Sequence, residues 1–293
     1  MRRSIFVFIL TLSFVTGKLL SQTPADSPFY LAGISDATVF TDLKIALKEP
    51  EKVYKMQLFN TPFDPKLAPK IPKLNNLQCL QLENNSITTL PSEFLGFNGL
   101  LFFSSAKNEL HQIPKDFAGL QNLMFLELYD TKLDSLPHTF AYLSRLQSFQ
   151  IQNNHSDTFK LPINFGELSS LNDLVLFNVK IDSLPPSIGQ LKKLKSFYLV
   201  NSRLKSLPSS IGHCDQLEKL VLDGNQLTEL PKGLFKLKNL GYLSLKNNHI
   251  EHISDYICYL TNLAEIDLSG NPISEHDRAI LQALLPGCRI TWK

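Results

Sequence analysis

The sequence carries no large excess of charge of either sign. It has 29 lysines and arginines against 27 aspartates and glutamates, a formal net charge of +2. Arg2, Arg3 and Lys18 lie within the first 21 residues, which contain no acid, so the rest of the chain has 26 basic and 27 acidic residues and a net charge of −1. A nucleic-acid-binding domain needs a basic surface. We therefore expect no nucleic-acid partner.

Apolar runs are short. The run from Ile5 to Val15 is well below the roughly 20 residues that a transmembrane helix needs. It follows two arginines and precedes the small residues Gly17 and Ser21, an arrangement typical of a signal peptide and its cleavage site. We predict a signal peptide over residues 1–21, export to the periplasm, cell surface or medium, and no transmembrane segment after its removal. A leader that does not function would leave the protein in the cytoplasm.

The sequence offers no complete set of catalytic or metal-binding side chains. His249 and His252 have no third ligand near them in sequence, which favours a solvated loop over a zinc site. No nucleophile is accompanied by a base. Asp223, Glu265 and Asp267 could form a carboxylate pair or a calcium site, but they are more simply interpreted as the acidic rim of a binding surface. We expect no enzymatic activity, no cofactor and no metal.

An internal repeat dominates the rest of the chain. The pattern L-x-x-L-x-L-x-x-N-x-L-x-x-L-P recurs in steps of 23 residues, with one step of 25 that begins at Leu146. The copies start at Leu77, Leu100, Leu123, Leu146, Leu171, Leu194, Leu217, Leu240 and Leu263. The fullest copy is LEKLVLDGNQLTELPKGLFKLKN at 217–239, and a degenerate earlier copy begins at Val53. A period of this length is typical of a solenoid.

This repeat resembles the leucine-rich repeat superfamily over about residues 53–273. Within it, the pattern is similar to the 23-residue LPxxIGxLxxL class of Ras-suppressor-type, plant disease-resistance-type and exported bacterial proteins. The resemblance implies an α/β fold: a curved right-handed solenoid with a concave parallel β-sheet and short 3₁₀ or irregular turns on the convex side. It specifies the fold and leaves the function open.

Each repeat supplies one strand with two kinds of side chain. In LEKLVLDGN, Leu220 and Leu222 point to one face and pack on equivalent leucines of neighbouring coils, because no single repeat can bury its leucines alone. A second apolar row lines the convex side of the core: Phe94, Phe117, Phe140, Phe165, Ile188, Ile211, Leu234 and Ile257. The Leu-Pro pairs before this row favour extended starts and short turns over full helices.

An asparagine follows most strands, and its amide can both donate to and accept from backbone groups where the chain turns inward. The predicted structural ladder is Asn85, Asn108, Asn154, Asn225, Asn248 and Asn271. Thr131, Val179 and Ser202 interrupt it. Val179 has no polar side-chain atom, so the turn there needs another source of hydrogen bonds, such as water.

Both ends of a solenoid need caps, because a terminal coil would otherwise expose its core. An amino-terminal capping helix is predicted over residues 36–49, with an apolar face of Phe40, Leu43, Ala46 and Leu47. A second helix is predicted over 275–285, followed by a short strand with Ile290 and Trp292. The predicted organisation is a signal peptide (1–21), a linker and capping helix (22–52), about ten coils (53–274) and a carboxyl-terminal cap (275–293).

Four cysteines in an exported chain would normally suggest two disulfides. Cys214 occupies a leucine position of the repeat and Cys258 an alanine or glycine position, so both are predicted to be buried. Cys79 is expected on the concave face, many coils from the others. Cys258 and Cys288 form the one pair that could meet, and the sequence leaves open whether they are bridged.

Two strands break the expected alternation of apolar and polar residues: LVLF at 174–177 and FYLV at 197–200. In the repeat register their leucines and Phe197 are core, and the residues between them should be exposed on the concave sheet. The predicted partner-binding residues are Phe125, Glu127, Tyr129, Val175, Phe177, Tyr198, Val200, Val221, Asp223, Tyr242 and Lys246. An apolar centre with a charged rim is typical of protein recognition. Alternatively, these residues are only good strand formers.

We interpret the protein as an exported, non-enzymatic scaffold whose concave face binds another protein or a peptide. A glycan-binding module of the cell envelope is an alternative, with Tyr129, Phe177 and Tyr198 stacking on sugar rings. Its polar groups would come from Gln150, Gln152 and Asn201. A homodimer formed through the concave face is a third interpretation.

Overall fold

The computed structural model describes residues 36–62 and 64–293. The predicted signal peptide (1–21) and residues 22–35 of the predicted linker lie outside the described residues. Thr38–Lys293 form one compact unit, which contains all of the described strands.

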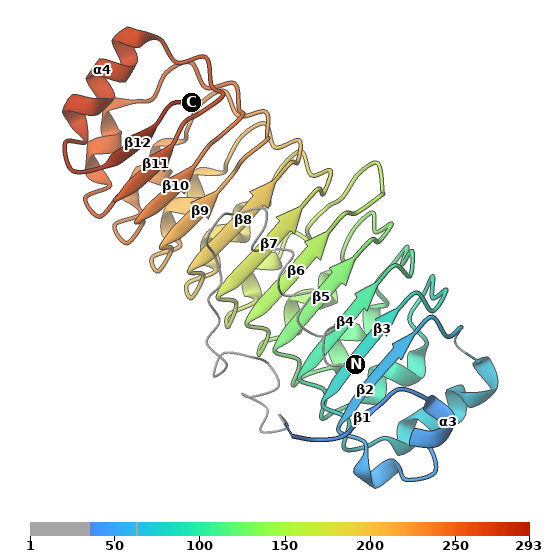
Figure 1. Cartoon of the computed structure of the whole chain (residues 1–293). Coiled ribbons are helices and arrows are strands. Elements are labelled where there is room, and N and C mark those ends of the chain that lie inside the picture. Colours follow the sequence, from blue (N-terminus) through green and yellow to red (C-terminus); the bar gives the residue numbers. More distant parts are fainter. Residues whose placement is uncertain (1–35, 63) are drawn as a thin grey trace. The chain divides into compact units, whose positions relative to one another are not determined.

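A parallel sheet runs through this unit, and its strands follow one another in sequence order among the described residues (Figure 1). They are β1 (Val39–Phe40), β2 (Lys55–Phe59), β3 (Cys79–Glu83), β4 (Phe102–Ala106), β5 (Phe125–Tyr129), β6 (Ser148–Gln152), β7 (Asp173–Phe177), β8 (Ser196–Val200), β9 (Lys219–Val221), β10 (Tyr242–Ser244), β11 (Glu265–Asp267) and β12 (Arg289–Thr291). Each predicted copy, including the degenerate one at Val53, supplies one strand, so the predicted repeat is confirmed.

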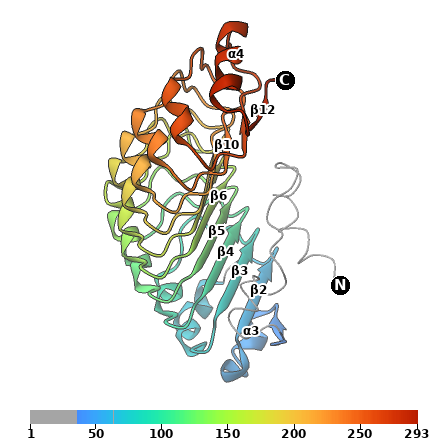
Figure 2. The same ribbon diagram turned by 90° about the vertical axis from the view of Figure 1, so that its left-hand side faces the viewer.

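Short 3₁₀ turns lie opposite the sheet, on the convex side of the unit (Figure 2). They are η3 (Pro65–Lys73), η4 (Ser92–Gly96), η5 (Lys115–Gly119), η6 (His138–Tyr142), η7 (Phe165–Glu167), η8 (Pro186–Gln190), η9 (Ser209–His213), η10 (Lys232–Lys236) and η11 (Asp255–Tyr259), with η2 (Pro50–Lys52) before β2. The prolines that directly precede η5, η6, η8, η9 and η10 have extended backbone. The prediction of 3₁₀ turns in place of full helices is confirmed.

The core lies between the sheet and these turns. Leu174 of β7 pairs in register with Phe197 of β8, and both are fully buried. On the convex side the rings of Phe117, Phe140 and Phe165 stack from coil to coil, with centroids 6.3 and 6.4 Å apart and interplanar angles of 9° and 6°. All eight residues of the predicted convex row are buried, as predicted.

The ladder asparagines join neighbouring coils through backbone hydrogen bonds. Asn225 Nδ2 donates to the carbonyl oxygens of Leu199 (2.7 Å) and Leu222 (2.9 Å). Its Oδ1 accepts from the N–H of Leu204 at 3.1 Å. Asn248 and Asn271 repeat this arrangement one and two coils later. Each side chain therefore satisfies backbone groups that a tight, buried turn would leave unpaired.

At the turn that includes Val179, the backbone itself replaces the bond that Ser202, 21 positions after Ile181, would accept in a regular coil. The N–H of Ile181, which corresponds to that of Leu204 one coil later, donates to the Val179 carbonyl oxygen at 2.8 Å. The Ser202 hydroxyl donates to the carbonyl oxygen of Val200 in its own coil at 3.4 Å. The suggested water is therefore not needed to satisfy the Ile181 N–H.

The residue before each ladder position adopts a left-handed backbone conformation, a feature that the sequence reasoning did not identify. These residues are Asn84, Lys107, Asp130, Asn153, Asn178, Asn201, Gly224, Asn247 and Gly270, with φ between +51° and +72°. Asparagine, aspartate and glycine adopt this conformation at the lowest cost, which explains their prevalence at this position. The sharp turn directs the following side chain into the core.

Glycine on the convex side allows neighbouring coils to approach closely. A Cβ atom built on Gly189 would overlap the carbonyl oxygen of Ser210 in the next coil. Gly166 and Gly212 meet the backbone of Ser187 and Gly233 in the same way. The glycine of the LPxxIGxLxxL pattern therefore serves backbone-to-backbone packing between coils.

The amino-terminal helix is shorter than predicted. α3 covers only Leu43–Ala46, because the Asp42 carboxylate accepts hydrogen bonds from two backbone N–H groups of the first turn and so fixes its start. The preceding Phe40 belongs to β1 and pairs with β2. The prediction of a helix over the whole of 36–49 was wrong, although the buried side chains of Leu43 and Ala46 do face the core.

The carboxyl-terminal end closes the core as the sequence pattern indicated. α4 (Glu275–Leu284) begins at Ser274, whose hydroxyl accepts from the Asp277 N–H at 3.1 Å. Leu281 is buried against the last coil, and β12 extends the sheet by one strand. The Arg278 guanidinium lies 5.4 Å from the ring centroid of Trp292, which joins the helix to the end of the chain.

All four cysteines are free. Cys214 is buried and its thiol lies 3.2 Å from the carbonyl oxygen of Ile188, which confirms its predicted burial. Cys258 is exposed, so its predicted burial was wrong. The equivalent glycines 189 and 212 are covered by the 3₁₀ turn of the next coil, whereas η11 is the last 3₁₀ turn and α4 leaves Cys258 uncovered.

Candidate functional site on the concave sheet

The sheet register brings the predicted apolar residues together. Val175, Tyr198 and Val221 occupy matching positions of β7, β8 and β9, and Phe177 pairs with Val200 in the adjacent column. Because neighbouring parallel strands lie about 4.8 Å apart, these side chains form one contiguous group. We call these five residues the apolar patch.

The apolar patch is less exposed than predicted. In the full-length chain Val175 and Tyr198 each expose 4% of their surface, Val200 8% and Val221 5%, while Phe177 is half-buried. The expectation that half of each strand sequence is left open was therefore wrong for the first four. Their side chains do alternate with those of the core, as the repeat register predicted.

Glu127 lies beside this patch toward the amino-terminal end. It belongs to β5, with Phe125 and Tyr129 at the two ends of the same strand. The residue keeps partial exposure, yet desolvation of its carboxyl group raises its pKa to about 7, and hydrogen bonds from Tyr129 and Ser104 oppose that shift. The Tyr129 hydroxyl also lies 3.4 Å from Gln150 Oε1.

Toward the carboxyl-terminal end, two tyrosines flank a lysine. The Lys219 ammonium lies 5.5 Å from the ring centroid of Tyr198 and 4.5 Å from that of Tyr242. Burial lowers the pKa of Lys219 to about 8, although the nearby Glu265 carboxylate opposes the shift. Lys219 is not among the predicted partner-binding residues, because its spacing from the two rings depends on sheet register.

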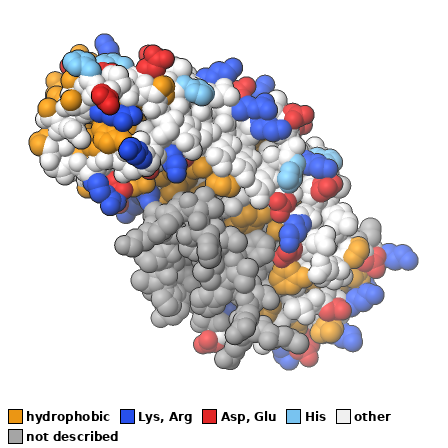
Figure 3. Space-filling view, turned by 45° about the horizontal axis from the view of Figure 1, so that its top comes forward, with side chains coloured by type: hydrophobic (Ala, Val, Ile, Leu, Met, Phe, Trp, Pro, Cys, Tyr) orange, Lys and Arg blue, Asp and Glu red, His pale blue; other side chains and the backbone are white. Residues whose placement is uncertain are grey.

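Asp223 and Lys246 lie at the edge of the apolar patch, just after β9 and β10. The Asp223 carboxylate accepts from the Ser244 hydroxyl at 2.5 Å and from the Lys246 backbone N–H at 3.1 Å. Burial raises the pKa of Asp223, and these two hydrogen bonds oppose the increase. Lys246 is exposed. Figure 3 shows acidic and basic side chains mixed on the visible face, with hydrophobic side chains between them.

Two family models match parts of the chain. The model described as "Leucine rich repeat" matches residues 215–273, and a second, "Leucine Rich Repeat", matches residues 76–97. Both lie on the coils described above. The chain is a leucine-rich repeat protein.

Solved structures of other leucine-rich repeat proteins share its fold. The leucine-rich repeat domain of the type III effector XopL is 25% identical, with a TM-score of 0.59, over 78% of this chain and 79% of that domain. The ectodomain of the Arabidopsis thaliana receptor kinase GASSHO1/SCHENGEN3, solved with CASPARIAN STRIP INTEGRITY FACTOR 2, is 26% identical, with a TM-score of 0.61, over 75% of this chain and 26% of that one. The functional domain of InlJ from Listeria monocytogenes is 17% identical, with a TM-score of 0.64, over 90% of this chain and 50% of that one. No curated protein matches the sequence.

The described residues form neither a metal-binding group nor a membrane-spanning helix. In residues 36–62 and 64–293, no three histidine, cysteine, aspartate or glutamate side chains gather into a group that could hold a metal ion. His252 instead contacts Asp277, with 2.8 Å between Nδ1 and Oδ1, across the last coil and the cap. None of the described helices is long and apolar enough to cross a bilayer.

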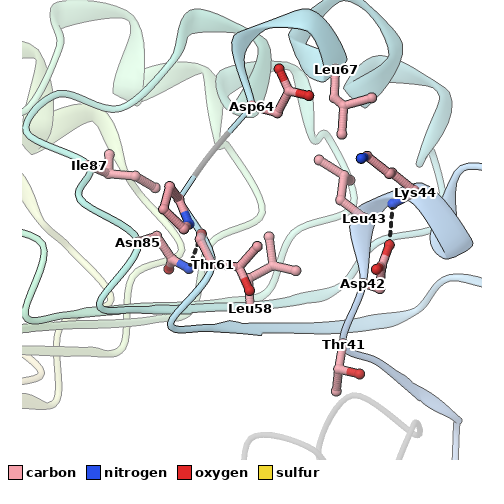
Figure 4. Close-up of a pocket in the computed structure, with 11 residues that line it drawn as sticks. Thr41, Asp42, Leu43, Lys44, Leu58, Thr61, Asp64, Leu67, Asn85 and Ile87 are labelled. Atoms are coloured by element: carbon pink, nitrogen blue, oxygen red, sulfur yellow. Dashed lines mark hydrogen bonds between the residues drawn. The ribbon is translucent and has the colours of Figure 1, made fainter.

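A pocket of about 180 Å³ at the amino-terminal end of the leucine-rich repeats was not predicted (Figure 4). Asn85 lies at its wall and donates through Nδ2 to the carbonyl oxygen of Thr61 at 2.8 Å. Its buried Oδ1 has no hydrogen-bond partner among the described residues. In the regular coils this oxygen accepts the N–H of the residue 21 positions earlier, as Asn225 does from Leu204. A pocket water can satisfy the oxygen.

A second unpredicted feature lies on the convex side of the leucine-rich repeats. Tyr256 and Tyr259 expose 44% and 53% of their surface and stack with a centroid distance of 5.8 Å. Lys232 and Lys238 lie over the two rings at 5.8 and 5.6 Å. The signal in the sequence is the pair of tyrosines at repeat positions that carry small or polar residues in most other coils.

Proposed function

We propose that this leucine-rich repeat protein is an exported, non-enzymatic scaffold that binds a protein or peptide partner on its concave sheet. The apolar patch on β7 to β9 is the observation that carries the proposal. The coils are held together by the leucine core and the asparagine ladder, which lie on other faces of the strands. The aromatic and aliphatic character of the patch is therefore not required by the core, and it matches the apolar centre of a protein interface.

The charged surroundings support the same function. Glu127, Lys219, Asp223 and Lys246 lie around the apolar patch, and both signs of charge are present. Mixed charges at the rim of an interface contribute more to binding specificity and to the association rate than to affinity. The GASSHO1/SCHENGEN3 ectodomain, which has the same fold, was solved in complex with CASPARIAN STRIP INTEGRITY FACTOR 2, and this supports testing a protein or peptide partner first.

Export is the second part of the proposal, and the amino-terminal sequence supports it. Residues 1–21 combine two arginines, a short apolar run and small residues near the expected cleavage point. A partner on the cell surface or in the envelope would then be accessible to the concave sheet. The non-enzymatic part of the proposal rests on the sequence, in which no nucleophile is accompanied by a base.

Site-specific photo-crosslinking tests the proposal. A photoreactive amino acid at position 177 would be compared with one at position 142, because Tyr142 is 51% exposed and lies in η6 on the convex side. In the native organism, position 177 should crosslink one protein or peptide specifically, and position 142 should not. Crosslinks to glycan or to a second copy of this chain would replace the proposed partner class. Equal crosslinking at both positions would contradict a concave site.

A further inference from the structure

Lys219 occupies an unusual position on the concave sheet. It starts β9, between Tyr198 of β8 and Tyr242 of β10, and both rings lie within 5.5 Å of its ammonium group. Tyr242 pairs directly with Lys219 in the sheet register, and Tyr198 lies one strand away on the other side. Aromatic faces attract a cation but cannot accept its strong hydrogen bonds as a carboxylate can.

The nearby carboxylates already have other partners. Glu265, one strand beyond Tyr242, lies 2.5 Å from the Arg289 guanidinium. Asp223 is held by the Ser244 hydroxyl and the Lys246 N–H. No ion pair joins Lys219 to any acidic residue in the described part of the chain. The partly buried Lys219 cation therefore lies beside the apolar patch without a direct ion pair among the described residues.

A second polar group with unused hydrogen-bonding capacity belongs to Tyr198, whose ring flanks Lys219. The hydroxyl of Tyr198 is buried and has no hydrogen-bond partner among the described residues. Burial also raises the pKa of this hydroxyl, and the Asp173 carboxylate contributes, so the group stays a neutral donor. A buried hydroxyl without a partner costs free energy that a bound acceptor would recover.

We infer that Lys219 and the Tyr198 hydroxyl form a binding point for a carboxylate of the partner, so that the partner is an acidic peptide segment. The inference rests on the proposed function and names the chemistry of the partner at that same surface. The carboxylate would accept a charge-assisted hydrogen bond from Lys219 and a second bond from Tyr198, while the ring of Tyr242 and the apolar patch contact the neighbouring apolar residues of the segment.

A carboxylate fits this site better than a doubly charged phosphate. The site offers one ammonium group, and Asp223, Glu265 and Asp267 lie on the same side of the sheet within two strands of it. These acids would repel a second negative charge. Desolvation of Lys219, which lowers its pKa, also shows that water solvates the ammonium poorly, so a single carboxylate displaces little water.

Selection from a random peptide library displayed on phage tests the inference. The full-length wild-type protein would be compared with Lys219→Gln, Lys219→Arg and the matched convex variant Lys238→Gln, whose cation also lies over a tyrosine ring. Wild-type selections should converge on sequences with a shared Asp or Glu flanked by apolar residues. Lys219→Gln should lower the affinity for a selected synthetic peptide by at least about tenfold. Replacing the acidic residue of that peptide with Asn or Gln should have the same effect on the wild-type protein. Lys238→Gln should have no effect, and Lys219→Arg should retain most of the affinity.

The outcomes separate the inference from the proposed function. Two outcomes would overturn the carboxylate site and leave concave-face binding intact. In the first, the selected peptides lose binding to Phe177→Asp but share no acidic residue. In the second, they bind Lys219→Gln as tightly as they bind the wild-type protein. Selections that yield no peptide sensitive to Phe177→Asp would count against both. Circular dichroism and thermal unfolding of each variant would show that the loss is not caused by unfolding.

Discussion

The Asn201 side chain packs against Gly224 of the next coil. Gly224 has a φ of +66°, and a Cβ atom built on it would overlap the Oδ1 atom of Asn201, 2.3 Å away. Asn201 has the same left-handed conformation one coil earlier, with φ of +52°. Glycine at 224 therefore meets two requirements at once: a left-handed backbone and room for the preceding asparagine.

Replacing Gly224 with alanine should destabilise the protein by roughly 1–3 kcal/mol, because a left-handed alanine is strained and its methyl group displaces the Asn201 side chain. Urea unfolding would measure the change. Gly96→Ala is the matched control, since no atom lies within 4 Å of a Cβ built there. Equal stability of Gly224→Ala and Gly96→Ala would contradict the interpretation.

Gly189→Ala should destabilise the protein at least as much. Overpacking between the coils should lower the free energy of unfolding by about 1–3 kcal/mol or more. Its methyl group would overlap the backbone carbonyl of Ser210, which cannot rotate away as a side chain can. The thermal midpoint of Gly189→Ala, compared with that of Gly96→Ala, is the measurement. An unchanged midpoint would show that the coils can separate without cost.

Glu127 should make stability depend on pH. Its pKa rises from an ordinary value of 4.5 to about 7 in the folded chain. The folded state therefore keeps a proton that the unfolded state releases, so the free energy of unfolding should fall as the pH rises from about 4.5 to about 7. Below this window both states are protonated and the penalty is absent. Glu127→Gln should remove this part of the pH dependence, measured by urea unfolding at several pH values; an identical slope in both proteins would refute the assignment.

Phe177→Asp should weaken partner binding by about 2 kcal/mol or more, which is roughly a thirtyfold rise in Kd, because aromatic anchors near an interface centre commonly carry that much binding free energy. Phe177 is half-buried, so the variant should remain folded. The more deeply buried Tyr198 is unsuitable for the same charge substitution. Tyr142→Asp on the convex side controls for added surface charge. Retained affinity of Phe177→Asp would place the partner on another surface.

Deleting residues 275–293 should cause aggregation and lower the thermal midpoint, since α4 and β12 cover the last coil. Light scattering and circular dichroism would follow both effects. A truncated chain that stays monomeric with unchanged stability would show that the last coil needs no cover.

Removal of the leader is tested by intact mass. Protein recovered from the periplasmic or medium fraction should lack about the first 21 residues, as expected for a cleaved signal peptide. Full-length chain found only inside the cell would rule out export.

The repeat period determined most of the fold. A step of 23 residues with leucines at fixed positions leaves each coil unable to bury its own core, so stacking, strand position and the convex row all follow from the sequence. The same alignment identified the concave residues. The sequence predicted the start of the amino-terminal helix less well. Asp42 caps α3, so the helix does not extend to Phe40, which pairs in the sheet instead.

Tertiary structure alone decided exposure and pairing. Cys258 is exposed because no further 3₁₀ turn follows η11, and four of the five residues of the apolar patch expose less than a tenth of their surface although the pattern places them on the concave face. The placement of Lys219 between Tyr198 and Tyr242 depends on residues 21 and 23 positions away in the chain that the sheet brings together. A sequence pattern specifies which face a side chain takes, but burial and electrostatics are sums over neighbours from other coils, and only the folded stack fixes those distances.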